Sequence, residues 1–237
     1  MYATIAQNIH RLLRMTSHNY IPVREIPINS RSLTGTLSSG SRFESSLERD
    51  LMNILRFDIN VDRFIEQPLK IPFVDPKGVS RTYTPDILII HRRDILPAKL
   101  MPQILGEVKY REDLRANFAS YKPKFKAAMR YAKAQGWEFR IFTEREIRTP
   151  FLKNAVFLLK YKQPDPYPDS GDILEVLEKL HELRETNVQT LLVSIHRDKW
   201  NQARLLPVIW HLVAIRRIGN DLTQPITMSS PIWTMRK

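Results

Sequence analysis

The sequence predicts an α/β fold in which a domain with a mixed sheet is followed by a smaller, mostly helical domain. The predicted elements before residue 162 run in the order helix, strands, helix, strand, which is typical of a small α/β domain. A stretch with three prolines and a glycine, residues 162–172, then has the composition of a linker, and helical periodicity dominates after it. We therefore predict two domains, residues 1–163 and 164–237.

Composition narrows the class of protein. The chain has 237 residues, a net charge of +12 and no cysteine. So large a positive net charge indicates a nucleic acid as the partner most often, and an anionic membrane less often. The lack of cysteine excludes disulfides, thiolate nucleophiles and cysteine zinc sites, and it agrees with a reducing compartment. The apolar run that begins at Leu205 is too short to span a bilayer, and the N-terminus lacks the pattern of a signal peptide, so we expect a cytoplasmic bacterial protein.

The predicted N-terminal domain begins with helical segments. Residues 1–15 have an amphipathic helical pattern, and residues 29–46 have loop composition. A helix is expected after that loop, because Ser45 and Glu48 have the spacing of a capping box. Its buried face is predicted to consist of Leu47, Leu51, Ile54 and Leu55.

Strand-like runs follow. Residues 63–74 and 81–90 are joined by the turn sequence "DPKGVS", so we predict a hairpin, and "QILGEVKY" is a third strand. A long helix is predicted over residues 112–135, ended by Gly136. Its apolar side is expected to comprise Leu114, Phe118, Phe125, Met129 and Ala132. A fourth strand, "EFRIFT", and a helix at "NAVFLLKY" complete the domain.

The C-terminal part is predicted to hold three helices and a final hairpin. The helices cover residues 173–183, 187–196 and 199–217, and a turn at "GNDL" with the final run "QPITMSSPIW" suggests one hairpin. These are the elements of a winged helix, although a generic helical cap has the same pattern.

Three charged residues stand at the ends of predicted buried strands. Glu107 and Lys109 are two residues apart, so they share a face of their strand. Asp86 begins the preceding strand directly after Pro85, and the two strand ends can meet. Paired carboxylates attract a hard divalent cation such as Mg²⁺, and a lysine beside it can act on water and phosphate. The arrangement predicts a site that hydrolyses phosphodiesters.

These residues carry a resemblance to a known family. "P-D", a spacer, and "E-V-K" resemble the PD-(D/E)xK motif of nucleases with the restriction-endonuclease-like fold. The segments "HNYIPVREIP", "SSLERDLMNILRF", "FIEQPLKI", "YTPDIL", "GEVKY" and "FRIFTEREI" are similar, in order and spacing, to TnsA, the endonuclease subunit of heteromeric cut-and-paste bacterial transposons. The resemblance covers roughly residues 18–160, and TnsA-like proteins often carry a C-terminal winged-helix domain.

The resemblance implies roles for individual residues. Glu48 would be a further acidic metal ligand, Asp86 would bridge the metals, and Glu107 would be the second strand acid. Lys109 would be the catalytic lysine, and Gln67 would have a supporting role. Some family members carry glutamine where this chain has Glu107. The implied cofactor is Mg²⁺, for which Mn²⁺ can substitute.

Each of these residues also has a plain structural interpretation. Glu48 can serve only the capping box, Asp86 can be a turn residue, and Glu107 with Lys109 can belong to a solvated strand face. Basic residues next to the site have two interpretations as well, a solvated helix face or contacts with the DNA backbone. They are Arg111, Arg115, Lys122, Lys124 and Lys126.

The resemblance implies an Mg²⁺-dependent endonuclease that nicks the 5′ ends of the transposon. It implies three partners: transposon-end double-stranded DNA, a DDE-type (TnsB-like) transposase, and an AAA+ (TnsC-like) regulator that contacts the C-terminal domain. Two other functions stay open at this point. One is a stand-alone restriction or repair nuclease, and the other is a non-catalytic architectural subunit that binds DNA.

Overall fold

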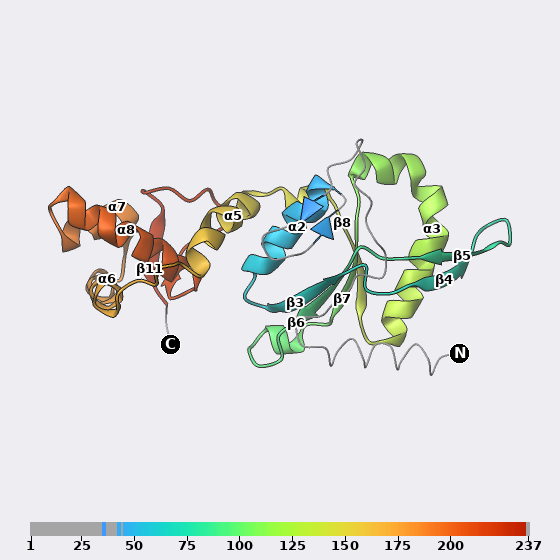
Figure 1. The fold of residues 1–237 in the computed structure, drawn as a ribbon, viewed down its shortest axis with the longest axis horizontal. Coiled ribbons are helices and arrows are strands. Elements are labelled where there is room, and N and C mark those ends of the chain that lie inside the picture. The colour runs from blue at the N-terminus through green and yellow to red at the C-terminus, as the bar shows by residue number, and fades with distance from the viewer. Residues whose placement is uncertain (1–34, 37–41, 44, 236–237) are drawn as a thin grey trace.

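A four-stranded mixed sheet forms the centre of the N-terminal half in the computed structural model, which describes residues 35–36, 42–43 and 45–235 (Figure 1). The strand order is β3-β6-β7-β8. The first three strands pair antiparallel, and β7 and β8 pair parallel. The four strands are β3 (Val61–Glu66), β6 (Ile87–His91), β7 (Ile104–Val108) and β8 (Glu138–Phe142). The mixed α/β fold predicted from the sequence is therefore confirmed.

Helices cover both faces of this sheet (Figure 1). Helix α2 (Ser46–Phe57) packs on one face together with α4 (Glu144–Ile147), and α3 (Arg111–Ala134) packs on the other. Successive residues of β6 and β7 alternate between the two layers, as strand geometry requires. Ile87 and Val108 thus face α2, whereas Leu88 and Leu105 face α3.

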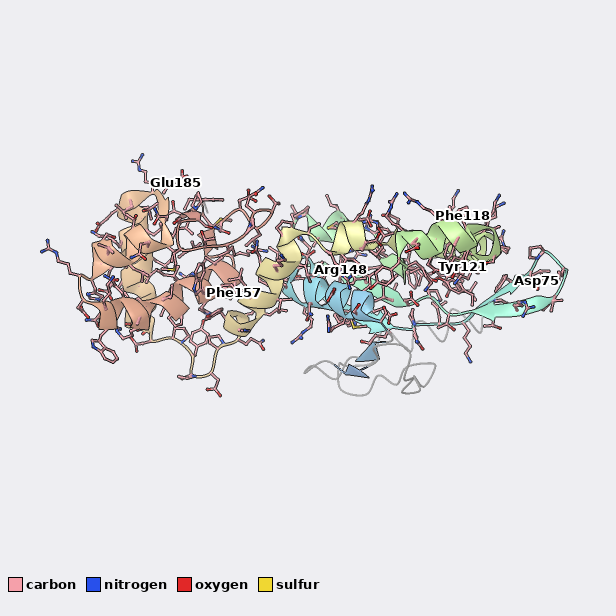
Figure 2. All side chains as sticks on the ribbon, turned by 90° about the horizontal axis from the view of Figure 1, so that it is seen from above. Asp75, Phe118, Tyr121, Arg148, Phe157 and Glu185 are labelled. Atoms are coloured by element: carbon pink, nitrogen blue, oxygen red, sulfur yellow. The ribbon has the colours of Figure 1, made fainter. Side chains whose placement is uncertain are left out.

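The predicted hairpin is present but is divided between two sheets. Its inner part is the β3–β6 pair, and its outer part is a separate ladder of β4 (Ile71–Val74) and β5 (Ser80–Tyr83). The outer ladder projects from the body of the molecule, with Asp75 at its tip (Figure 2). Gln67, at a φ of 45°, marks the break on one strand, and Pro85 marks it on the other.

Helix α2 begins where the sequence predicts. Ser45 is its N-cap, and the serine hydroxyl accepts a hydrogen bond from the backbone N–H of Glu48. Three of the four predicted apolar residues are buried, and Ile54 packs against them from a partly exposed position. The predicted helix over residues 1–15 lies outside the described residues, as does most of the predicted loop 29–46, of which β1 (Gly35–Thr36) and β2 (Arg42–Phe43) are described.

The predicted apolar face of α3 is wrong at two positions. Phe118 is 51% exposed and Met129 is 57% exposed. The helix instead packs through small residues, because alanines allow it to approach the sheet closely. The buried residues are Phe125, Ala127, Ala128 and Ala132.

The C-terminal part comprises three helices and a three-stranded antiparallel sheet. The helices are α6 (Ser170–Leu183), α7 (Val188–Ile195) and α8 (Lys199–Ala214). The sheet has the order β10-β11-β9, with β9 (Glu185–Asn187), β10 (Ile218–Gly219) and β11 (Pro231–Thr234). The terminal hairpin is thus confirmed as the β10–β11 pair, and β9 is a third strand that the sequence did not reveal. This order of elements agrees with a winged helix, and the winged-helix assignment stays a prediction.

Helix α5 (Pro150–Lys162) connects the two halves (Figure 1). It packs against α2 on one side and α8 on the other. Its residues Ala155 and Leu158 share a core cluster with the C-terminal helices, and so does Phe57 at the end of α2. The boundary after residue 163 stays a prediction, but the hydrophobic core of the C-terminal half clearly includes residues that precede it.

Gly106 is required where β7 passes between its neighbours. A Cβ at this position would lie 2.7 Å from Cγ2 of Ile87 and 2.9 Å from Cε2 of Phe142. Both atoms belong to packed side chains that cannot move freely. The glycine therefore allows three strands to lie close together directly beside Glu107.

Replacing this glycine should destabilise the protein. Gly106→Ala forces Ile87 and Phe142 apart, and we expect it to lower the free energy of unfolding by about 1–3 kcal/mol, as overpacking does elsewhere. Urea denaturation followed by circular dichroism measures the change. An unfolding midpoint equal to that of the unsubstituted protein would contradict the close packing described here.

Candidate active site

Asp86, Glu107 and Lys109 come together at one end of the central sheet. The Lys109 ammonium lies 3.3 Å from Glu107 Oε1 and 3.8 Å from Asp86 Oδ2. It also donates a hydrogen bond to the backbone carbonyl of Val108 at 3.1 Å. Three oxygen atoms thus surround one cationic nitrogen, as the strand positions predicted from the sequence require.

The backbone holds the two strand ends in register at this point. The N–H of Asp86 donates to the carbonyl of Gly106, and the N–H of Val108 donates to Asp86 Oδ2 at 2.7 Å. On the other side, the N–H of Lys109 donates to the carbonyl of Phe142 at the end of β8. The position of the Asp86 carboxylate is therefore fixed by β7, and the position of Lys109 is fixed by β8.

Glu107 is the most enclosed charge in the site, with a side chain that is 1% exposed. Its Oε2 accepts a hydrogen bond from the Tyr83 hydroxyl at 2.5 Å. Its Oε1 contacts Lys109 and also Lys124, whose ammonium is 2.9 Å away. A buried carboxylate requires such donors, because burial without them would cost several kcal/mol.

The site carries more negative charge than its surroundings easily tolerate. Burial and the charge of Glu107 raise the pKa of Asp86 to about 8, although Lys109 acts in the opposite direction. Burial alone would lower the pKa of Lys109, but the charges of Asp86 and Glu107 outweigh it and raise this pKa. Lys109 is therefore a protonated cation here, and Tyr83, whose pKa is raised by burial and by Glu107, is a neutral donor.

Glu48 is less closely involved. It lies in the first turn of α2, and its charge acts on both Asp86 and Lys109. However, within residues 35–36, 42–43 and 45–235, no three acidic or histidine side chains are grouped closely enough to hold a metal ion. The predicted ligand set of Glu48, Asp86 and Glu107 therefore stays a prediction, and this conformation does not assemble it.

The donor chemistry nevertheless fits a hard divalent cation. The Lys109 ammonium stands in for a cation among Asp86 Oδ2, Glu107 Oε1 and the carbonyl oxygen of Val108. Carboxylate and carbonyl oxygens are the ligands that Mg²⁺ and Ca²⁺ prefer. These three atoms could hold such an ion, and the Val108 carbonyl is a candidate ligand that the sequence did not suggest.

The predicted DNA-contacting residues separate into two groups. Arg115, Lys122 and Lys126 are exposed on α3, and Arg111 is partly exposed at its start. Lys124 instead turns inward to Glu107. Gln67, to which a supporting role was assigned, is buried, and its backbone N–H donates to the carbonyl of Asp86.

An open pocket of about 390 Å³ lies beside the site, where α3 begins. Ile141 of β8 lies opposite Glu107 in the β7–β8 register, so the pocket lies next to Glu107. It is lined by Arg111, Leu114, Arg115, Phe118, Ile141, Thr143 and Glu146. Figure 2 places Phe118 and Tyr121 on α3.

Two models of protein families match this chain. One, described as TnsA-like endonuclease N terminal, matches residues 58–144, and the other, TnsA endonuclease C terminal, matches residues 146–222. This chain belongs to the TnsA-like transposon endonuclease family. It is therefore an endonuclease subunit of a transposase, which acts on transposon DNA, and its α/β half has the restriction-endonuclease-like fold.

The family match bears differently on the predicted residues. Asp86, Glu107 and Lys109 lie within the first matched segment, and Glu48 precedes it.

No curated protein matches the chain. Among the described residues, no helix is long and apolar enough to cross a membrane.

Removing the charge of Asp86 should stabilise the metal-free protein. An acid whose pKa is raised in the folded state makes the protein less stable as the pH rises. For Asp86 the loss runs from its pKa in the unfolded chain, near 4, towards its pKa in the folded protein, about 8. Asp86→Asn keeps an oxygen that can accept from Val108, and we expect it to raise the free energy of unfolding at pH 8 by on the order of 1–3 kcal/mol. The difference should shrink towards pH 4, which urea denaturation at several pH values would measure.

Asp75→Asn is a control in which the change in stability at pH 8 should have the opposite sign. Arg81 and the backbone N–H groups of Val79 and Lys77 lower the pKa of Asp75, so this carboxylate stabilises the fold when it is ionised. Its replacement should lower stability at pH 8, with the loss disappearing as the pH falls below the ordinary range of aspartate. A loss of stability at pH 8 in Asp86→Asn as well would contradict the electrostatic description of the site.

Proposed function

We propose that this chain is the Mg²⁺-dependent subunit that nicks the 5′-end strand at each transposon end. A DDE-type (TnsB-like) transposase would cut and join the 3′ ends, and an AAA+ (TnsC-like) regulator would contact the C-terminal domain. The observation that supports the nuclease assignment best is the convergence of Asp86, Glu107 and Lys109 in a chain of this family.

The chemistry follows from the site. Hydrolysis requires a water oxygen to attack phosphorus while the bond to the leaving oxygen breaks and that oxygen acquires a proton. A bound Mg²⁺ would stabilise negative charge on the phosphate and lower the pKa of water. Asp86 and Glu107 would hold the ion together with the Val108 carbonyl. Lys109, which is protonated, is suited to orient the water and to stabilise charge that develops on a phosphate oxygen.

Basic residues around the site support DNA as the substrate. Arg115, Lys122 and Lys126 project into solvent from the helix that follows Lys109, and the chain has a net charge of +12. Arginine and lysine side chains contact phosphates without reading sequence, so they position the duplex over the carboxylates. The choice of transposon end would then depend on the partner transposase.

The decisive experiment is strand-specific cleavage of transposon-end DNA with and without the partner transposase. Mg²⁺ or Mn²⁺ should support cutting of the 5′-end strand, Ca²⁺ should permit binding with little turnover, and EDTA should abolish cutting. Asp86→Ala should abolish only the 5′ cut and leave the partner's 3′ cut intact. Cutting by this chain alone on any duplex would instead favour a stand-alone nuclease, and no 5′ cut in the complete complex would favour an architectural subunit.

Three variants should differ in how Mg²⁺ rescues them. Glu107→Gln keeps a carbonyl oxygen that can ligate a cation, so raising Mg²⁺ should recover part of its nicking. Asp86→Asn should stay inactive at high Mg²⁺, because the bridging role that the resemblance implies for Asp86 depends on its charge. Lys109→Ala should lose turnover while its metal affinity stays at least as high as that of the unsubstituted protein.

The measurement is a Mg²⁺ titration of nicking rate for each variant. Charges about 4 Å apart interact by about 4 kcal/mol at an effective dielectric near 20, which sets the upper range for the change in metal affinity. Equal losses in Glu107→Gln and Asp86→Asn, with no rescue of either, would show that the two acids do not share the ion as proposed.

A further inference from the structure

Lys124 is a second lysine of the active site, contributed by the middle of α3 and not by the motif strands. Its ammonium lies 2.9 Å from Glu107 Oε1. It also lies over the rings of Tyr121 at 4.5 Å and Tyr83 at 4.8 Å. Aromatic faces attract a cation, so these rings hold the ammonium at the carboxylate. With a side chain only 19% exposed, Lys124 is not placed to serve mainly as a surface contact.

The two lysines near Glu107 have different partners. Lys109 is shared between Glu107 and Asp86, and it also donates to the Val108 carbonyl. Lys124 has its ion pair with Glu107. Because the Glu107 side chain is almost fully enclosed, the negative charge requires a partner of its own. Lys124 meets this requirement, while Tyr83 supplies a neutral donor to the other oxygen.

This arrangement has a consequence for metal binding. The proposed ion would take Glu107 Oε1, which is the atom that Lys124 already contacts. A tethered ammonium and a divalent cation repel each other and compete for one carboxylate oxygen. The Tyr83 hydroxyl contacts Oε2 and carries no charge, so it orients the carboxylate without this competition.

We propose that Lys124 is a positioning residue that neutralises Glu107 in the metal-free protein and competes with the divalent cation for Glu107 Oε1. Tyr83 fixes the orientation of the same carboxylate. The inference rests on the proposed function for the presence of the cation, but the neutralising role concerns the metal-free protein alone. In effect, Lys124 keeps the site assembled before the ion arrives and sets how tightly the ion is held.

The first test is the Mn²⁺ affinity of the full chain without DNA, measured by the electron paramagnetic resonance signal of free Mn²⁺. Lys124→Met keeps an apolar stem over the rings but removes the charge, and Mn²⁺ should bind on the order of tenfold more tightly. Lys124→Arg keeps the charge and should bind Mn²⁺ as the unsubstituted protein does. Lys133→Met, an exposed change on the same helix, is the matched control and should also leave the affinity unchanged.

Tyr83→Phe separates competition from a merely structural role. It removes the donor that orients Glu107 and should weaken Mn²⁺ binding, opposite in sign to Lys124→Met. If both residues only supported the local fold, both changes would weaken binding. Unchanged or weaker Mn²⁺ binding by folded Lys124→Met would overturn the competition.

The second test measures thermal stability without metal, and it remains informative if Lys124→Met folds poorly. Lys124→Met should lower the melting temperature, because it removes the closer of the two ammonium groups that neutralise the buried Glu107 charge. Glu107→Gln in the same chain should restore most of the loss, since no charge then remains to be neutralised. A double variant no more stable than Lys124→Met would overturn the neutralising role. If the unsubstituted protein binds no Mn²⁺, the proposed metal dependence fails and the competition with it, whereas this comparison still decides the neutralising role.

Discussion

The buried charge of Glu107 is the constraint on which the rest of the site depends. Removing a carboxylate from water costs several kcal/mol unless donors replace the lost hydration. Its donors come from three different places in the fold: Tyr83 at the end of β5, Lys109 just beyond β7 and Lys124 on α3. The projecting hairpin, the central sheet and the long helix must therefore all be in place before this charge is satisfied. The geometry of the site therefore depends on the packing of the whole domain.

Helix α2 extends that dependence to the C-terminal half. Glu48 lies in its first turn, and Asp50 pairs with Arg148, which also donates to Ser46 and to the Tyr110 hydroxyl. At the other end of the same helix, Phe57 is fully buried in the core that α5 and α8 share. The same helix therefore contacts the active site at one end and the C-terminal core at the other. The proposed acidic ligand on α2 is thus positioned by contacts at both ends of its helix.

The sequence predicted the strand residues of the site but not the residues that reach it from elsewhere. Asp86, Glu107 and Lys109 follow from the alternation of side chains on paired strands, a local rule that the structure obeys. Which face of α3 would meet the sheet could not be predicted, because the longest apolar side chains suggested a stripe through Phe118 and Met129. The alanine face of α3 packs on the sheet instead, because small side chains allow the helix to approach more closely. With this face inward, Lys124 points towards Glu107. Tyr83 was missed for a similar reason: its partner is 24 residues away, and only the bend after the β4–β5 ladder brings the two together.

Charge balance also explains why an acid in this position needs a second lysine. The resemblance to TnsA-like proteins implies that some relatives carry glutamine where this chain has Glu107. A glutamine can still offer an oxygen to a hard cation, but it brings no negative charge into the core. With glutamate the site gains a charge that is 1% exposed, and Lys109 is shared between this carboxylate and Asp86. The second ammonium, which lies over the rings of Tyr83 and Tyr121, supplies the additional positive charge beside this acid.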